Sequence, residues 1–354
     1  MNSESQGLER ASGARSAGIE LAARFTDLQS EWAAVRQRCG LLDARFRGLL
    51  RMIGSDRTTF LQGMVTNDVA GLHEGQGTYA ALLTIQGKVV SDLRVYALAD
   101  ELWLEGPAAR MGAVREAFDR HIVADDVEFV SDEAWAPLVA VEGPQAARTL
   151  VGVLGDTVEG LQPFAHREST FDGSPVRVAA VSHTGENGYL LFGNPAMASK
   201  LWEHCHAAGA EPVGMEALNV LRLEAGIPWY GPDFDDSILI GEAGLDAAIS
   251  YRKGCYLGQE VVERVAARGQ LHRKLVGLLC EGEVVPPPHS KLVHAAQEAG
   301  WVTSAVWSPA HRSVIALGYA KSECWDPGTE VQVALPQGSA VARVVALPFY
   351  ARSS

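Results

Sequence analysis

The sequence has few cysteines, and their spacing excludes the commonest cysteine-based sites. The 354 residues include five cysteines, which are Cys39, Cys205, Cys255, Cys280 and Cys324. None lies in a C-x-x-C motif or a local Cys/His cluster, so we expect no zinc knuckle, no Fe–S cluster held by such a motif and no bound metal. An odd and sparse set of thiols is typical of a reducing compartment, which predicts a cytoplasmic protein.

Long hydrophobic runs and basic charge are also scarce. No apolar run approaches the roughly 18 residues of a membrane span, so no membrane association is predicted. The first 24 residues lack an apolar core and contain three glutamates, which argues against a secretory or transit peptide. The 30 Lys and Arg residues against 43 Asp and Glu give a net charge of −13, which repels phosphate backbones and makes nucleic acid an unexpected partner.

The pattern of apolar residues predicts an α+β protein with a separate C-terminal β-domain. Residues 78–105 alternate with period two and break twice, which predicts a three-strand meander, and the segments that follow mix further strands and helices. After residue 271 every periodic segment is strand-like, which is typical of a small β-barrel or sandwich. The predicted strands are 275–281, 300–307, 314–320, 329–335 and 340–347. We therefore expect a disordered tail over 1–18, an α+β region of two lobes over 19–270, and a β-barrel domain over 271–354.

The segment R-K-G-C-Y-L-G-Q-E (252–260) is the most unusual stretch of the chain. Two cations precede Cys255, and nearby positive charge favours the thiolate form. Cys255 is therefore a candidate reactive thiol or single metal ligand. The alternative is a buried and inert cysteine, which is the usual environment of an unpaired thiol.

Three more polar residues are candidates for a binding site. Glu186 lies in T-G-E-N-G, where a carboxylate on a tight turn could accept hydrogen bonds from a planar heterocycle, although a solvated hairpin turn has the same composition. Asp92, in mid-strand, could be a general base or half of a surface pair with Arg94. Arg222, at a helix end, could hold an anionic group or lie on the surface, and Tyr230 could stack on a ring or pack in the core.

Taken in order, these segments resemble the YgfZ/glycine-cleavage T-protein superfamily of folate-binding proteins. The similarity runs from about residue 25 to the end and includes V-T-N-D-V (65–69), T-G-E-N-G-Y (184–189), R-L-E-A-G-I-P-W-Y-G (222–231) and E-A-G-L (242–245). The segment K-G-C-Y-L-G-Q-E (253–260) is similar to the signature of the YgfZ branch, the folate-dependent proteins of Fe–S cluster assembly and repair. This signature comprises Lys253, Gly254, Cys255, Gly258, Gln259 and Glu260.

The resemblance implies a cloverleaf fold, in which two α+β lobes and a C-terminal barrel surround a channel for tetrahydrofolate. It makes Glu186 the anchor of the pterin ring and places Asp92 near the reactive nitrogens of the folate. It also implies that Arg222 and Tyr230 lie beside the folate pocket and that Cys255 is the functional thiol.

Two functions follow from the resemblance, and the motifs divide between them. The cysteine signature favours a tetrahydrofolate-binding accessory protein for Fe–S cluster assembly or repair, whose partners would be Fe–S client proteins. Glu186 and Asp92 resemble the T-protein branch, which implies a folate-dependent aminomethyltransferase or demethylase that carries out one-carbon transfer with a lipoylated carrier protein. We weight the signature more and expect the first function, with the second as the alternative.

Overall fold

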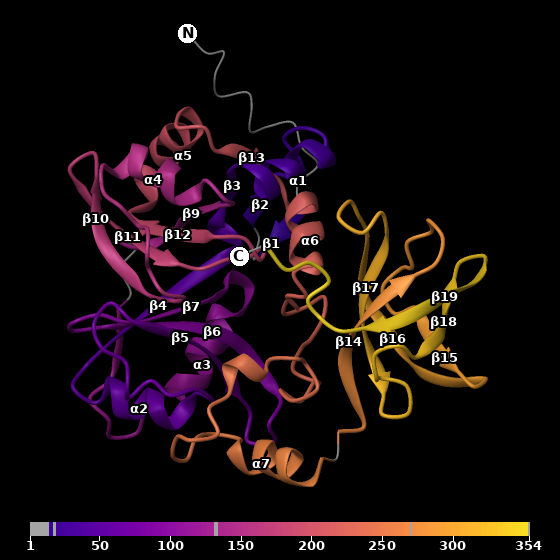
Figure 1. Ribbon diagram of the computed structural model, residues 1–354. Helices are drawn as coiled ribbons and strands as arrows, with labels where there is room; N and C mark the ends of the chain where they lie inside the picture. The colour runs from indigo at the N-terminus through magenta and orange to yellow at the C-terminus, as the bar shows by residue number, and fades with distance from the viewer. Residues whose placement is uncertain (1–13, 17–18, 131–133, 270, 353–354) are drawn as a thin grey trace. The chain divides into compact units, whose positions relative to one another are not determined.

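The computed structural model describes residues 14–16, 19–130, 134–269 and 271–352 (Figure 1). The chain divides into two compact units. Unit 1 comprises Met1–Gln62, Asp68–Tyr79 and Leu93–Asn219, and unit 2 comprises Gly63–Asn67, Ala80–Asp92 and Val220–Ser354. The predicted tail falls almost wholly outside the described residues. The described part of it, β1 (Ala14–Ser16), pairs with β2 (Ile19–Leu21), which follows the tail, in a two-stranded sheet.

Unit 1 contains a six-stranded sheet with helices packed on it. The strand order is β10-β11-β12-β9-β3-β13, and all neighbours are antiparallel except β3 and β13. The strands are β10 (His166–Phe171), β11 (Ser174–Ala180), β12 (Gly188–Gly193), β9 (Ala136–Glu142), β3 (Gly40–Asp43) and β13 (Glu211–Val213). Apolar side chains of α4 (Ala146–Leu154) and α5 (Ala198–Ala207) share one core with this sheet, because both helices are apolar on one face.

A second sheet contains the predicted meander. Its order is β5-β6-β7-β4-β8, and its strands are β5 (Gly77–Leu83), β6 (Val89–Ala97), β7 (Leu102–Pro107), β4 (Arg47–Ile53) and β8 (Glu128–Val130). The first three confirm the meander that the period-two pattern predicts over 78–105. Along the chain, β5 and β6 each begin in one unit and end in the other, since the division falls after Tyr79 and after Asp92.

The remaining helices are mostly short. The α-helices are α1 (Leu28–Gln37), α2 (Arg57–Met64), α3 (Met111–Asp119), α6 (Met215–Glu224) and α7 (Gln259–Arg268), and the 3₁₀ turns are η1 (Ala44–Phe46), η2 (Ala108–Arg110), η3 (Pro195–Met197) and η4 (Asp246–Ala248). In the part of the chain that the structure describes, none of the helices has both the length and the apolar character needed to cross a membrane.

The C-terminal part of unit 2 is a closed antiparallel barrel, which confirms the predicted α+β fold with a small β-barrel. Its order is β14-β17-β16-β15-β18-β19, and β19 pairs with β14 to close it. The strands are β14 (Arg273–Cys280), β15 (Lys291–His294), β16 (Gln297–Ser308), β17 (Ser313–Lys321), β18 (Glu330–Leu335) and β19 (Gly338–Val345). Five of them match predicted segments. The sequence pattern missed β15, because four residues are too few to show a period.

Candidate functional site

Glu186 is buried although its neighbours Gly185 and Asn187 in the same loop are exposed, so the fully solvated hairpin turn that the composition suggests is wrong. The loop joins β11 to β12 in unit 1, and His183, Thr184 and Glu186 are all buried. Glu142, the last residue of β9, holds it in place. Its carboxylate accepts hydrogen bonds from the His183 amide at 2.9 Å and from the Thr184 hydroxyl at 2.6 Å. A buried carboxylate with several donors fixes the backbone around it.

Arg36 of α1 fixes the other side of the same loop. Its Nη1 donates to the carbonyl oxygen of Thr184 at 2.9 Å and to Oε1 of Glu186 at 2.9 Å. Both side chains of the ion pair are only 4% exposed. Gly185, between Thr184 and Glu186 in the chain, has a φ of +83°, which is energetically unfavourable for a residue with a Cβ. The Glu186 carboxylate is therefore held at a defined position inside unit 1.

A second buried ionic cluster adjoins this loop. Glu105 of β7 is fully buried and accepts hydrogen bonds from Arg47 and from Arg94, the latter at 3.0 Å. Burial alone would raise the pKa of Glu105, but Arg47 and Arg94 outweigh it and bring the pKa to about 2. Arg94 also lies 2.9 Å from Nε2 of His183. Burial, with Arg94 adding to it, lowers the pKa of His183 and favours the neutral ring.

Asp92 lies in β6 and is buried, with 7% of its surface exposed. Arg94, two residues further along the same strand and therefore on the same face, is also buried. The surface pair that the sequence allows is thus wrong. A carboxylate in mid-strand and away from bulk solvent is suited to act on a bound molecule.

Arg222 of α6 is almost fully buried within unit 2, which contradicts a surface position. Its Nη1 forms an ion pair with Asp233 and its Nη2 donates to Ser304 Oγ at 2.9 Å. Asp233 also accepts from the Thr303 hydroxyl at 2.7 Å and from the Trp229 amide at 2.9 Å. These bonds join α6, the loop after it and strand β16. The structure therefore gives Arg222 a network of its own inside unit 2.

The aromatic residues after α6 belong to the same network. The Trp229 ring lies under the Arg222 guanidinium, with 5.1 Å between the guanidinium carbon and the ring centroid. Tyr230 is half-buried and packs edge-on against Phe234, with ring centroids 5.5 Å apart. Tyr230 therefore has both a packing contact and an accessible surface.

The cysteine signature divides into structural residues and exposed ones. Lys253 donates from Nζ to the carbonyl oxygens of Val65 at 2.6 Å and Asn67 at 2.9 Å, so its ammonium ties two segments of unit 2 together. Cys255 is exposed, which contradicts a buried inert thiol, and it is the one exposed cysteine among the five. Gly258 has a φ of +83°, and a Cβ there would lie 2.5 Å from the Thr84 carbonyl oxygen.

The other members of the signature act locally. Gln259 Oε1 accepts from the Tyr256 amide at 3.2 Å, which helps to start α7. Glu260 is exposed and pairs with Arg264 one turn later. A Cβ added to Gly254 would meet no described residue within 4 Å beyond its chain neighbours, so no close contact requires glycine there. Cys255 is therefore the exposed thiol of the segment, and its role as a functional thiol stays a prediction.

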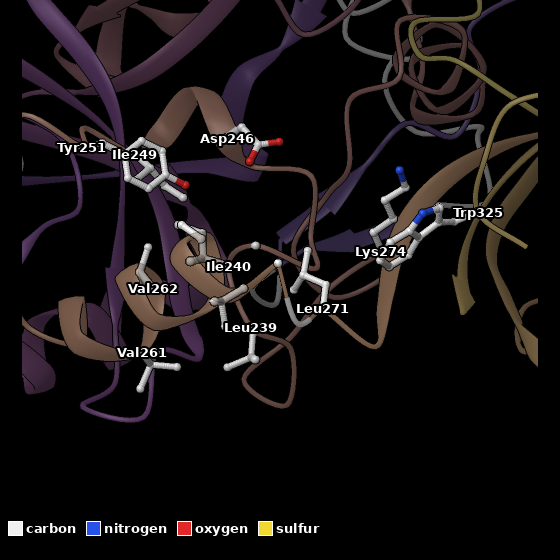
Figure 2. A pocket seen from close by; sticks show the side chains of 15 residues that line it. Leu239, Ile240, Asp246, Ile249, Tyr251, Val261, Val262, Leu271, Lys274 and Trp325 are labelled. Carbon is white, nitrogen blue, oxygen red and sulfur yellow. The ribbon is translucent and has the colours of Figure 1, made fainter. Parts of the chain in front are cut away.

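Unit 2 also contains an apolar cavity of about 360 Å³ (Figure 2). Side chains of α7, such as Val261 and Val262, line one side, and Leu271, Lys274 and Trp325 line another. None of the predicted site residues lines it. Within the described ranges 14–16, 19–130, 134–269 and 271–352, no three His, Cys, Asp or Glu side chains group so as to hold a metal ion.

Sequence reasoning missed the residues that position the predicted ones. Arg36 and Glu142 hold the Glu186 loop, and Asp233 holds Arg222. Arg36 and Glu186 are 150 positions apart in the chain, so no local spacing signals their pairing. Glu142 ends the apolar run L-V-A-V-E (138–142), and a carboxylate at the end of such a run is a weak signal that could have drawn attention to it.

Comparison with known proteins covers nearly the whole chain. Residues 5–253 match the GCVT N-terminal domain, and residues 273–351 match the glycine cleavage T-protein C-terminal barrel domain. An aminomethyltransferase of Rubrobacter xylanophilus is 36% identical over 97% of this chain and 92% of its own. An aminomethyltransferase of a Synechococcus strain is 32% identical over 95% of this chain and 94% of its own.

A solved structure has the same fold. The glycine cleavage system aminomethyltransferase T from Bartonella henselae superposes with a TM-score of 0.89 at 24% identity, covering 98% of this chain and 95% of that one. These similarities confirm the superfamily but give no support to the YgfZ branch that the cysteine signature suggests. The two matched domains and a relative that is 36% identical over 97% of this chain point to the same family. The chain therefore belongs to the glycine cleavage T-protein family.

Proposed function

We propose that this protein is a folate-dependent aminomethyltransferase of the glycine cleavage T-protein type. Its one-carbon acceptor is tetrahydrofolate, the cofactor of this family, and its partner is a lipoylated carrier protein that delivers the aminomethyl group. Relatives named aminomethyltransferase along the whole chain support this function over the Fe–S accessory role. We therefore prefer the aminomethyltransferase, which the motifs alone make the alternative, to the Fe–S accessory protein that the cysteine signature favours.

The Glu186 carboxylate, which is buried and held by Arg36, is the observation that carries the proposal. The aminopyrimidine edge of a pterin presents N–H donors, and a carboxylate is the acceptor that such an edge requires. A carboxylate can accept about four hydrogen bonds, so the bond from Arg36 at 2.9 Å leaves acceptor capacity for a ligand. The residues present therefore fit the cofactor.

We assign the chemistry to Asp92 and the binding to Glu186. When bound, tetrahydrofolate supplies a nucleophilic nitrogen for the one-carbon unit. Asp92, buried in β6, is the group that accepts or donates a proton at the reacting centre. Tyr230, which is half-buried, is the aromatic residue that we assign to stacking on the ligand, and Arg222 is held in place by its pair with Asp233.

The direct test is transfer from an aminomethylated carrier protein to tetrahydrofolate, followed as ammonia release and methylenetetrahydrofolate formation. Glu186→Gln should raise KM for tetrahydrofolate by about 10- to 100-fold, since a charge-assisted hydrogen bond contributes about 1.5–3 kcal/mol. Glu211→Gln is the matched control, because Glu211 also pairs with an arginine of unit 1 but is half-exposed. Asp92→Asn should lower kcat by about 10²-fold. A wild-type protein that binds tetrahydrofolate but transfers nothing would refute the proposal.

A role in Fe–S cluster assembly or repair is the second candidate, and the exposed Cys255 in K-G-C-Y-L-G-Q-E favours it. The two functions differ in their need for the thiol. Cys255→Ala should transfer the aminomethyl group as well as wild type does. An Fe–S accessory protein would instead restore an Fe–S enzyme in a strain that lacks its own factor, and the same variant would fail to do so.

A further inference from the structure

The Glu186 loop is fixed by a buried bridge of three residues that neither the motifs nor the comparisons assign to any role. We define the bridge as Arg94 of β6, His183 of the loop and Glu142 of β9. All three are buried, and all lie in unit 1. Glu142 bonds the backbone amides of His183 and Thr184, so the bridge acts on Glu186 through the backbone of the loop.

The first step concerns the protonation of His183. Arg94 Nη1 lies 2.9 Å from Nε2 of the ring, and an arginine can only donate, so Nε2 accepts. The proton of the neutral ring is therefore on Nδ1, which lies 2.7 Å from Glu142 Oε1 and donates to it. Phe46 packs edge-on against the ring, with centroids 5.3 Å apart, and fixes its plane. The hydrogen bonds thus run in one direction, from Arg94 through His183 to Glu142.

The second step concerns the loop backbone. Glu142 accepts from the amides of His183 at 2.9 Å and Thr184 at 3.1 Å, and from the Thr184 hydroxyl at 2.6 Å. On the other side, Arg36 holds the Thr184 carbonyl oxygen and the Glu186 carboxylate from a single nitrogen, each at 2.9 Å. Glu142 therefore holds Thr184 through its amide and hydroxyl groups, and Arg36 holds it through its carbonyl oxygen. Glu186 is two residues further along the chain.

We propose that His183 and Glu142 are positioning residues for the pterin anchor Glu186. Their bonds hold the loop before any ligand arrives, so that the carboxylate does not have to be ordered on binding. An anchor that is already in place binds more tightly, because ordering a loop opposes association. This inference rests on the proposed function, since it needs a pterin as the ligand of Glu186.

The test compares two buried histidines of unit 1. His166 resembles His183, because Arg177 Nη1 lies 3.0 Å from its Nδ1 and its Nε2 bonds a backbone carbonyl at 3.1 Å. It lies in β10 and has no bond described here to the Glu186 loop. His183→Gln and His166→Gln should both lower the urea midpoint, because both break buried hydrogen bonds. Only His183→Gln should raise KM and Kd for tetrahydrofolate, by about tenfold, with kcat at saturating folate within about threefold of wild type.

Glu142→Gln provides a second variant in case His183→Gln unfolds. The side chain of glutamine has one acceptor oxygen and one NH₂ group, so it cannot accept from the loop amides with two oxygens as Glu142 does. The same rise in KM is therefore expected. Equal stability loss in the two histidine variants with folate affinity unchanged in both would overturn the positioning role. A fall in kcat without a rise in KM would overturn it as well. A wild-type protein with no measurable tetrahydrofolate binding would instead refute the proposed function on which the inference rests.

Discussion

Asp233 offers the sharpest test of how unit 2 is held together. Replacing Asp233 by alanine removes the partner of Arg222, whose side chain is only 1% exposed. The guanidinium would then be a buried charge without its counter-ion, and breaking one side of a buried ion pair costs about 3–5 kcal/mol. The Thr303 hydroxyl, 2.7 Å from Asp233, and the Trp229 amide, at 2.9 Å, would lose their acceptor too. We therefore expect the upper end of that range.

The assay is urea unfolding at 25 °C, followed by circular dichroism. The loss of stability is the shift of the midpoint multiplied by the slope of the transition. Asp235→Ala is the matched control, because Asp235 lies two residues away but is exposed, and its carboxylate accepts only from Ser237 in the hydrogen bonds described, at 2.5 Å and 2.8 Å. The control should lose less than about 1 kcal/mol. A loss below about 1 kcal/mol for Asp233→Ala would refute the reasoning.

A double variant separates the structural role of Arg222 from a role in folate binding. Replacing a buried pair by apolar residues of similar volume is often neutral, so Arg222→Met with Asp233→Leu should regain most of the stability that Asp233→Ala loses. If this variant regains stability and keeps its affinity for tetrahydrofolate, Arg222 is a structural residue. If stability returns while folate binding is lost, the position of Arg222 beside the folate pocket, which the family resemblance implies, is supported.

Three further predictions concern single groups. Burial lowers the pKa of His166 to about 4, so acidification should remove up to about 3 kcal/mol of stability as the pH falls from about 6.5 towards 4; His166→Gln should show a smaller pH dependence, and an equal one would contradict the assignment. Iodoacetamide should modify Cys255 alone in the folded protein, since the other four cysteines are buried, and mass spectrometry after a short exposure will count the labels. Gly258→Ala should lower the urea midpoint by the equivalent of about 1–3 kcal/mol, because its φ is +83° and a Cβ would lie 2.5 Å from Thr84, whereas Gly254→Ala should change it little; similar midpoints for the two variants would argue against the close contact.

Local sequence patterns predicted some elements of the fold and missed others. The meander β5-β6-β7 and five barrel strands followed from period-two alternation, which is a local property of the chain. The sequence pattern missed β15 because it has only four residues, and it missed α7 because the helix begins inside the glycine-containing motif K-G-C-Y-L-G-Q-E. Whether the barrel would close or form a sandwich depended on the β14–β19 pairing, which no local pattern encodes.

The candidate site shows the same division. The motifs pointed to Glu186, Asp92, Arg222 and Cys255, because each is a reactive or charged residue in an unusual local context. They did not say which of these are buried, and the environments turned out to differ: Glu186, Asp92 and Arg222 are enclosed, while Cys255 is exposed.

The sequence by itself determined the periodicity of the elements, the α+β composition with its all-strand C-terminal segment, and the residues that carry reactive groups. Only the tertiary structure decided the partners of those groups. Arg36 reaches Glu186 across 150 positions and Glu142 reaches His183 across 41, and such pairs form only when the sheet brings distant segments together. An ionisable side chain owes its charge and orientation to burial and to these distant partners, and both are properties of the folded chain rather than of its sequence neighbours.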